Sequence, residues 1–169
     1  MTVLSEALVT ETWRACAQMP SAEAQAAIRK LGRQQPALLA YVLAASESLS
    51  PAAGELMVYL FFVVTRAFYA SGQRIRRVPP AAIDACEAEL ERRLLCLQGA
   101  HEAFVERAAA VLSATQPHAF RYLVEAVIEA PSEPVDPIPL TPEEEGALFL
   151  AIAMAITVLD QHCVPASQA

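Results

Sequence analysis

The sequence predicts an all-α fold: one domain over residues 1–169, built as a bundle of about seven or eight helices. Alanine accounts for 34 of the 169 residues, and alanine is the best helix former and a poor strand former. Hydrophobic residues make up 55% of the chain, which is enough apolar material to bury a sizeable core. Only 5 glycines are present, which excludes collagen-like and glycine-rich classes.

Prolines and capping residues divide the first half of the chain into helices. Pro20 ends the first helix, Pro36 lies in the first turn of the third, and Ser50 is an N-cap followed by proline. The expected helices cover residues 2–18, 21–34, 36–48 and 51–71. Arginines then make residues 74–77 a basic loop.

The same signals predict helices over residues 80–97, 101–114 and 117–130. Gly99 leaves open whether residues 97–101 break the helical path. Four prolines between positions 131 and 139 exclude helix and favour an extended connector over 131–142. A capping-box pattern at Thr141 and Glu144 starts the last helix, which runs to about residue 163. No internal repeat of fixed period is visible.

Two of these helices are apolar on all sides. Residues 56–64 are apolar without interruption, and residues 147–158 are apolar except for Thr157. Such helices are buried in a core, a membrane or an interface. The second run spans roughly 20 Å, whereas a bilayer core needs about 30 Å, so we expect a buried core and no membrane partner.

Small residues follow one side of the last helix at Ala147, Ala151 and Ala155, and we expect this stripe to pack on the 51–71 helix. The other side would then face other helices or a second subunit; it carries Leu148, Ile152, Ile156 and Leu159. Because two apolar helices need much cover, a homodimer is expected, with a monomer as the alternative.

Charge and cysteine usage narrow the functional classes. The net charge is −7, and residues 131–169 hold six acidic residues and no lysine or arginine. A helix-turn-helix over 21–48 would lack basic residues on its reading helix, so no nucleic-acid partner is expected. The first residues lack the pattern of a secretory signal, and no Cys-x-x-Cys pair occurs, which favours a cytoplasmic protein with reduced thiols.

One face of the 51–71 helix carries the candidate ligand-binding residues Tyr59, Arg66 and Tyr69. Their spacing places them on a single side, together with Glu55, Phe62 and Gln73. A guanidinium in such an apolar segment needs acceptors, so Arg66 is expected either to bind a small anionic ligand between the tyrosines or to form a structural ion pair.

Motifs for metal binding and catalysis are missing from the sequence. There is no Glu-x-x-His, no His-Glu-x-x-His, no nucleophile elbow and no glycine-rich phosphate loop, so neither a metal nor another cofactor is expected. A cysteine–histidine pair made by folding stays open, such as Cys86 or Cys96 with His101. The cluster of Asp160, His162 and Cys163 lies near the end of the chain, where fraying is expected.

Three functions follow from these observations. The first is a non-catalytic cytoplasmic protein that self-associates or binds a protein partner through an apolar helix face. The second is a small-molecule-binding protein that uses the Arg66 face. The third is a helical enzyme with a cysteine or histidine catalyst, and no catalytic residue is assigned for it.

Overall fold

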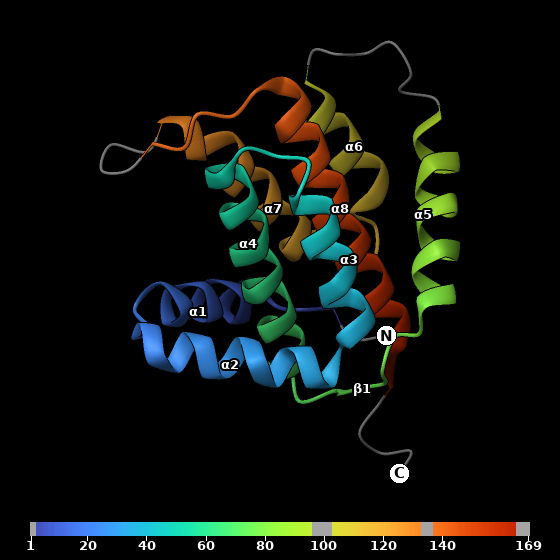
Figure 1. Cartoon of the computed structure of the whole chain (residues 1–169). Helices are drawn as coiled ribbons and strands as arrows, with labels where there is room; N and C mark the ends of the chain where they lie inside the picture. Colours follow the sequence, from blue (N-terminus) through green and yellow to red (C-terminus); the bar gives the residue numbers. More distant parts are fainter. Residues whose placement is uncertain (1–2, 96–102, 133–136, 165–169) are drawn as a thin grey trace.

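A computed structural model describes residues 3–95, 103–132 and 137–164, and it confirms the all-α fold (Figure 1). The described residues form eight α-helices packed as one bundle. They are α1 (Glu6–Ala17), α2 (Ser21–Gln34), α3 (Pro36–Ser46), α4 (Pro51–Ala70), α5 (Pro80–Leu94), α6 (Phe104–Leu112), α7 (Pro117–Glu129) and α8 (Pro142–His162).

Most helix boundaries follow the expected signals. Proline occupies the first turn of α3, α4, α5, α7 and α8, where no helical N–H is lost. The first helix is shorter than expected, because Ser5 caps it: the Ser5 hydroxyl accepts the Leu8 N–H at 3.2 Å. The possible break at residues 97–101 lies outside the described residues.

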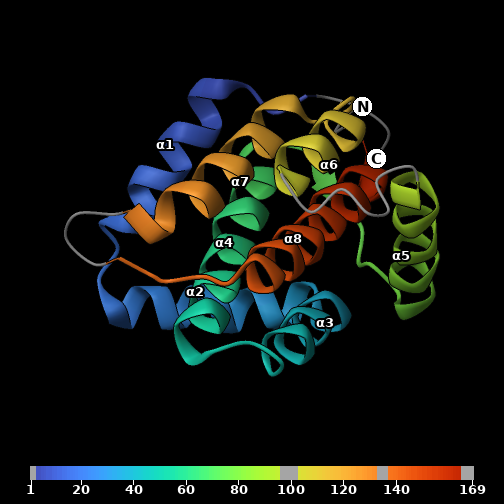
Figure 2. The same cartoon turned by 90° about the horizontal axis from the view of Figure 1, so that it is seen from above.

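The two apolar helices form the centre of the bundle, as Figure 2 shows. α4 packs against α1, α3 and α8, and α8 packs against α4, α5 and α7. The middle of α8 is buried on every side, from Ile152 to Ile156. Phe61 and Phe68 of α4 are also fully buried.

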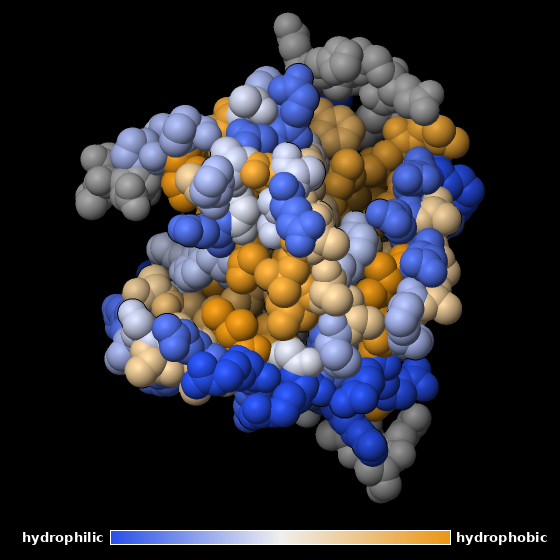
Figure 3. Space-filling model, in the orientation of Figure 1, coloured by the Kyte–Doolittle hydropathy of each residue, from blue (hydrophilic) through white to orange (hydrophobic). Residues whose placement is uncertain are grey.

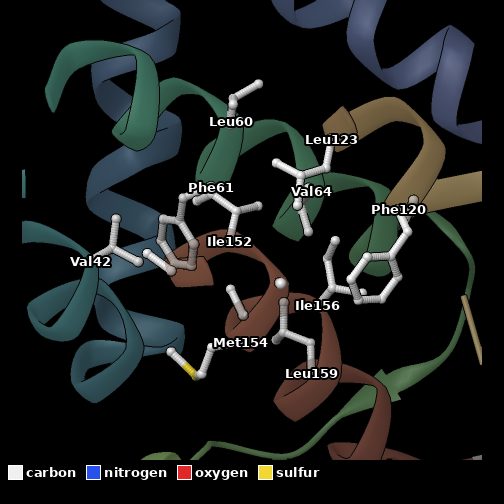
Figure 4. Packing of buried hydrophobic residues seen from close by; sticks show 14 of the residues in the cluster. Val42, Leu60, Phe61, Val64, Phe120, Leu123, Ile152, Met154, Ile156 and Leu159 are labelled. Atoms are coloured by element: carbon white, nitrogen blue, oxygen red, sulfur yellow. The ribbon is translucent and has the colours of Figure 1, made fainter. Parts of the chain in front are cut away.

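The side of α8 that carries leucine and isoleucine contacts α4. We expected from the sequence that the alanine side of this helix would instead pack on α4. In Figure 4, Ile152 points toward Phe61 of α4, and Ile156 points toward Val64 of α4 and Phe120 of α7. The alanine stripe is not continuous either, because Ala147 is exposed. With α8 surrounded by neighbours, both of its sides find cover within the chain.

α4 is the one helix among the described residues that is long and apolar enough to cross a membrane by length and composition. The core helix of a water-soluble protein passes the same test, and more than half of the apolar window in α4 is buried by the rest of the chain. The packing of α4 therefore accounts for its composition without a bilayer.

The basic segment after α4 is not a simple loop. Arg74–Ile75 forms the short strand β1, which pairs antiparallel with β2 (Cys163–Val164) directly after α8. The Arg76 N–H also donates to the His162 carbonyl at 3.0 Å. Backbone hydrogen bonds therefore hold the residues at the end of α8, while the end of the chain, where fraying is expected, lies outside the described residues.

The connector before α8 contains a short helical turn that the prolines did not predict. Residues Ala130–Ser132 form the 3-10 helix η2. Beyond it, the Ile138 N–H donates to the Ala130 carbonyl at 2.9 Å, so this end of the connector folds back on the end of α7. Residues 137–141 form neither helix nor strand, and Thr141 has an extended backbone, while residues 133–136 of the expected connector lie outside the described residues.

The described residues form two halves with a similar order of elements. In each half four α-helices are followed by a short strand, and the second half also has η2 between α7 and α8. In Figure 2 the last helices of the halves, α4 and α8, lie in the centre, while α1 and α5 lie on opposite sides, and so do α2 and α6. The strands that end the two halves pair with each other.

Two buried glutamines occupy equivalent positions in the two halves and form equivalent hydrogen bonds. Gln35 and Gln116 are the N-cap residues of α3 and α7, with φ and ψ of −132° and 63° and of −134° and 63°. The Gln35 side-chain oxygen accepts the Val78 N–H at 2.9 Å, just before α5, and the Gln116 oxygen accepts the Leu4 N–H at 2.9 Å, just before α1. Each half therefore fixes the start of the other half.

Glu144 connects the two central helices at their N-terminal ends. Its carboxylate accepts the Thr141 N–H at 3.0 Å and the Ser50 N–H at 2.9 Å, so the capping box of α8 also binds the N-cap residue of α4. These backbone hydrogen bonds, with the Thr141 contact largest, lower the pKa of Glu144 from 4.5 to about 2.

We expect Glu144→Gln to destabilise the fold near neutral pH and to lose this effect in acid. A carboxyl group whose pKa is lowered by folding stabilises the native state above its unfolded pKa, and the stabilisation disappears as the pH falls through the folded value of about 2. Urea unfolding of both proteins between neutral pH and pH of about 2 measures this. The matched control is Glu143→Gln, on an exposed residue of the same turn, and an equal effect of both variants would contradict the prediction.

Candidate functional site

A pocket of about 730 Å³ lies between α1, α4 and α7. We name it the α1/α4/α7 pocket. Its apolar and aromatic walls come from α1 (Val9, Trp13), α4 (Leu56, Tyr59, Leu60) and α7 (Tyr122, Ala126). Ile138 of the connector also lines it. The volume is in the range that holds a small organic molecule.

Charged side chains lie at the same pocket. Glu6 of α1 and Glu125 and Glu129 of α7 are exposed, and Arg121 is the one lysine or arginine that lines it. Arg121 forms ion pairs with Glu6 and, at 3.6 Å, with Glu125. The charge of these four side chains is therefore negative in sum, with the cation already paired.

The Tyr122 hydroxyl is buried and has no hydrogen-bond partner in the part of the chain that the structure describes. Burial, followed by the neighbouring Tyr59 and Cys16, raises the pKa of Tyr122 far above its ordinary value, so the hydroxyl stays neutral. A buried hydroxyl without a partner costs about 1–3 kcal/mol.

In the other half of the chain, the tyrosine at the corresponding position has a hydrogen-bond partner. Tyr41 lies six residues after Gln35, as Tyr122 lies six residues after Gln116. The Tyr41 hydroxyl donates to Glu87 of α5 at 3.1 Å. These residues line a smaller hollow of about 370 Å³ between α3, α5 and α8.

Trp13 is the counterpart of Glu87. Trp13 lies nine residues after Leu4, whose N–H binds Gln116. Glu87 lies nine residues after Val78, whose N–H binds Gln35. The Glu87 carboxylate accepts the hydrogen bond of Tyr41. Trp13, at the corresponding position of the first half, has an indole side chain, which cannot accept a hydrogen bond from Tyr122 in this way. This difference coincides with the larger pocket.

The three predicted ligand residues do not share one pocket. Arg66 and Tyr69 line a groove of about 490 Å³ between α1, α2 and α4, which we name the Arg66 groove. Tyr59 lines the α1/α4/α7 pocket instead. Opposite sides of α1 line the two hollows. Because α1 lies between them, Tyr59 is separated from Arg66 and Tyr69, although all three lie on one face of α4.

Arg66 is partly buried, and its guanidinium carbon lies 5.5 Å from the centre of the Phe62 ring. Lys30 and Glu11 line the same groove. The Tyr69 hydroxyl accepts a hydrogen bond from the Gln35 amide at 3.0 Å, which ties it to the cap of α3. A small anionic ligand at Arg66 stays a prediction.

The described cysteines do not resemble catalytic nucleophiles. Cys16, Cys86 and Cys163 are free thiols. Burial, with Glu89 and Asp160 as the next causes, raises the pKa of Cys86 and of Cys163 to about 11. Thiols with a raised pKa are protonated at neutral pH and react slowly. Cys96 and His101, the partners considered for a catalytic pair, lie outside the described residues.

Within residues 3–95, 103–132 and 137–164, no group of three or more histidine, cysteine, aspartate or glutamate side chains is placed to hold a metal ion. Asp160 is bound elsewhere: its carboxyl oxygen accepts from the Gln116 amide at 2.7 Å. The His162 ring Nδ1 lies 2.8 Å from the Val158 carbonyl. Asp160 and His162 are thus both occupied in contacts with the chain itself.

Sequence reasoning missed most of the α1/α4/α7 pocket. Trp13, Arg121 and Tyr122 belong to helices whose neighbours are fixed only by folding. One signal was present: the dipeptide Gln-Pro occurs twice before a helix and is followed each time by a tyrosine at the same distance, at Tyr41 and at Tyr122.

Comparisons of the chain with protein-family models, with curated proteins and with solved structures found no significant match.

Proposed function

We propose that this protein is a non-catalytic binding protein that takes up a small molecule with an apolar body in the α1/α4/α7 pocket. The observation that carries the proposal is the pocket itself, a hollow of about 730 Å³ with aromatic and aliphatic walls. Tyr122 lines it, and its buried hydroxyl has no partner among the described residues. Ligand sites in proteins combine such walls with a few polar groups that orient the ligand. The raised pKa values of the described thiols favour binding over catalysis.

A neutral apolar dye, N-phenyl-1-naphthylamine, tests this proposal. Trp13 is the only tryptophan of the chain and lines the pocket, so dye bound there gains emission and quenches Trp13 by energy transfer. We expect Ala126→Phe to weaken dye binding by about tenfold or more, because the added ring fills space the dye needs.

The matched control is Ile128→Phe, which enlarges an exposed residue of the same helix that does not line the pocket. Its dye affinity should equal that of the unaltered protein, and circular dichroism checks that both variants are folded. Equal binding by both variants, or no binding by the unaltered protein, would contradict the proposal.

Self-association, the function that the sequence favoured first, is a second candidate. A hollow of about 580 Å³ lies between α2, α3 and α4 and is lined by apolar residues including Ile28, Val58 and Phe62. Figure 3 shows hydrophobic side chains gathered over this part of α4. Light scattering decides the point: a mass of 18.2 kDa at micromolar concentration excludes a dimer.

A further inference from the structure

We infer that the α1/α4/α7 pocket selects a ligand that joins an apolar body to a positively charged amine. This inference rests on the proposed function and adds the chemical class of the ligand. It is carried by the charges at the pocket and by its aromatic side chains.

The charge of the pocket opposes an anion and attracts a cation. Glu6, Glu125 and Glu129 line the pocket with two basic side chains, Arg121 and His118, and Arg121 is already paired with the first two. The Glu129 carbonyl accepts from the Ser132 hydroxyl at 3.1 Å, but among the described residues its exposed carboxylate forms no ion pair and is available to a ligand. Partly exposed charges of one sign concentrate ligands of the opposite sign.

The aromatic side chains suit the same ligand. Trp13, Tyr59 and Tyr122 come from three different helices and line one hollow. The faces of tryptophan and tyrosine rings attract ammonium groups, and they also cover an apolar body.

The Arg66 groove provides a contrast within the same molecule. It has two cations, Arg66 and Lys30, and one carboxylate, Glu11. The two hollows flank α1 but have opposite charge, so a ligand that prefers the α1/α4/α7 pocket because of its charge will avoid the groove.

Three compounds that share one apolar body test the inference: 4-phenylbutylamine, 4-phenylbutanol and 4-phenylbutyrate. Trp13 fluorescence and titration calorimetry follow their binding to the full chain. At low ionic strength we expect the amine to bind about tenfold more tightly than the alcohol, and the carboxylate to bind most weakly. The preference should shrink when the ionic strength is raised to about 0.5 M, because salt screens exposed charges.

Glu129→Gln should reduce the preference for the amine over the alcohol while leaving the affinity for the alcohol unchanged. The matched control is Glu106→Gln, on an exposed residue of α6 outside the pocket, which should change neither affinity. Circular dichroism and urea unfolding establish that both variants fold.

The outcomes separate this inference from the proposed function. Equal affinities for the three compounds, or tightest binding of the carboxylate, would overturn the inference and leave the pocket a binding site. Binding of the naphthylamine dye but of none of the three compounds would also overturn it. If neither the dye nor any compound binds, the inference and the proposed function both fail.

Discussion

Gln116→Leu is expected to lower the free energy of unfolding by about 3 kcal/mol, because two buried polar groups lose their partner. The Gln116 side chain accepts from the Leu4 N–H at 2.9 Å and donates to the Asp160 carboxyl group at 2.7 Å. Gln116, Leu4 and Asp160 are all almost fully buried, so water cannot replace the lost hydrogen bonds without opening the fold.

The equivalent variant in the other half provides a graded comparison. Gln35→Leu removes the hydrogen bond from the Val78 N–H and those to the Tyr69 hydroxyl and the Arg76 carbonyl, but the last two are only partly buried. We therefore expect a smaller loss, about 2 kcal/mol.

The control for both glutamine variants is Gln161→Leu, at an exposed position of α8. We expect it to change the free energy of unfolding by no more than about 0.5 kcal/mol. Urea unfolding of the three variants measures the order. A loss for Gln116→Leu no larger than that for Gln161→Leu would show that the buried caps do not support the fold.

This glutamine also bears on the candidate site. Gln116 begins α7 and holds the residue just before α1, and these two helices form two walls of the α1/α4/α7 pocket. The position of Trp13 relative to Tyr122 therefore depends on a hydrogen bond between segments 112 positions apart in the chain.

Phe61→Ala is expected to cost about 3–5 kcal/mol of unfolding free energy, since it leaves a cavity at the centre of the bundle. Phe61 has no exposed surface, and it lies between α4 and α8 where Ile152 points toward it (Figure 4). Neighbouring side chains cannot fill the space without leaving their own packing positions.

Leu43→Ala is the matched control for the core variant. Leu43 is 45% exposed on α3, and its truncation should change stability by only about 0.5 kcal/mol or less. Urea unfolding with an unchanged slope establishes that both variants unfold in the same transition. A loss for Phe61→Ala as small as that for Leu43→Ala would show that the α4–α8 contact is not the core.

Much of the local structure followed from the sequence, and much of the site did not. Pro36, Pro51 and Pro142 placed helix starts correctly, because a proline acts on its own turn of helix. The spacing of Tyr59, Arg66 and Tyr69 predicted one shared face, but that spacing contains no information about which helix crosses it. α1 crosses there and divides the residues between two hollows.

The similarity of the two halves was hidden by unequal connections. Corresponding residues are 74 positions apart at Leu4 and Val78, and 81 apart at Gln35 and Gln116. They are 91 apart at the starts of α4 and α8, because the proline-rich connector is longer than its counterpart before α4. The two halves therefore share no fixed period, although the order of their α-helices and strands repeats.

By itself, the sequence determined the helical fold, most helix boundaries and the burial of α4 and α8. These properties depend on residues within one or two turns, through capping, proline geometry and apolar patterning. Only the tertiary structure decided which helices are neighbours, how β1 meets β2, and that Trp13, Tyr59 and Tyr122 line one pocket. Those arrangements depend on contacts between distant segments, such as Gln116 with Leu4, which no local pattern encodes.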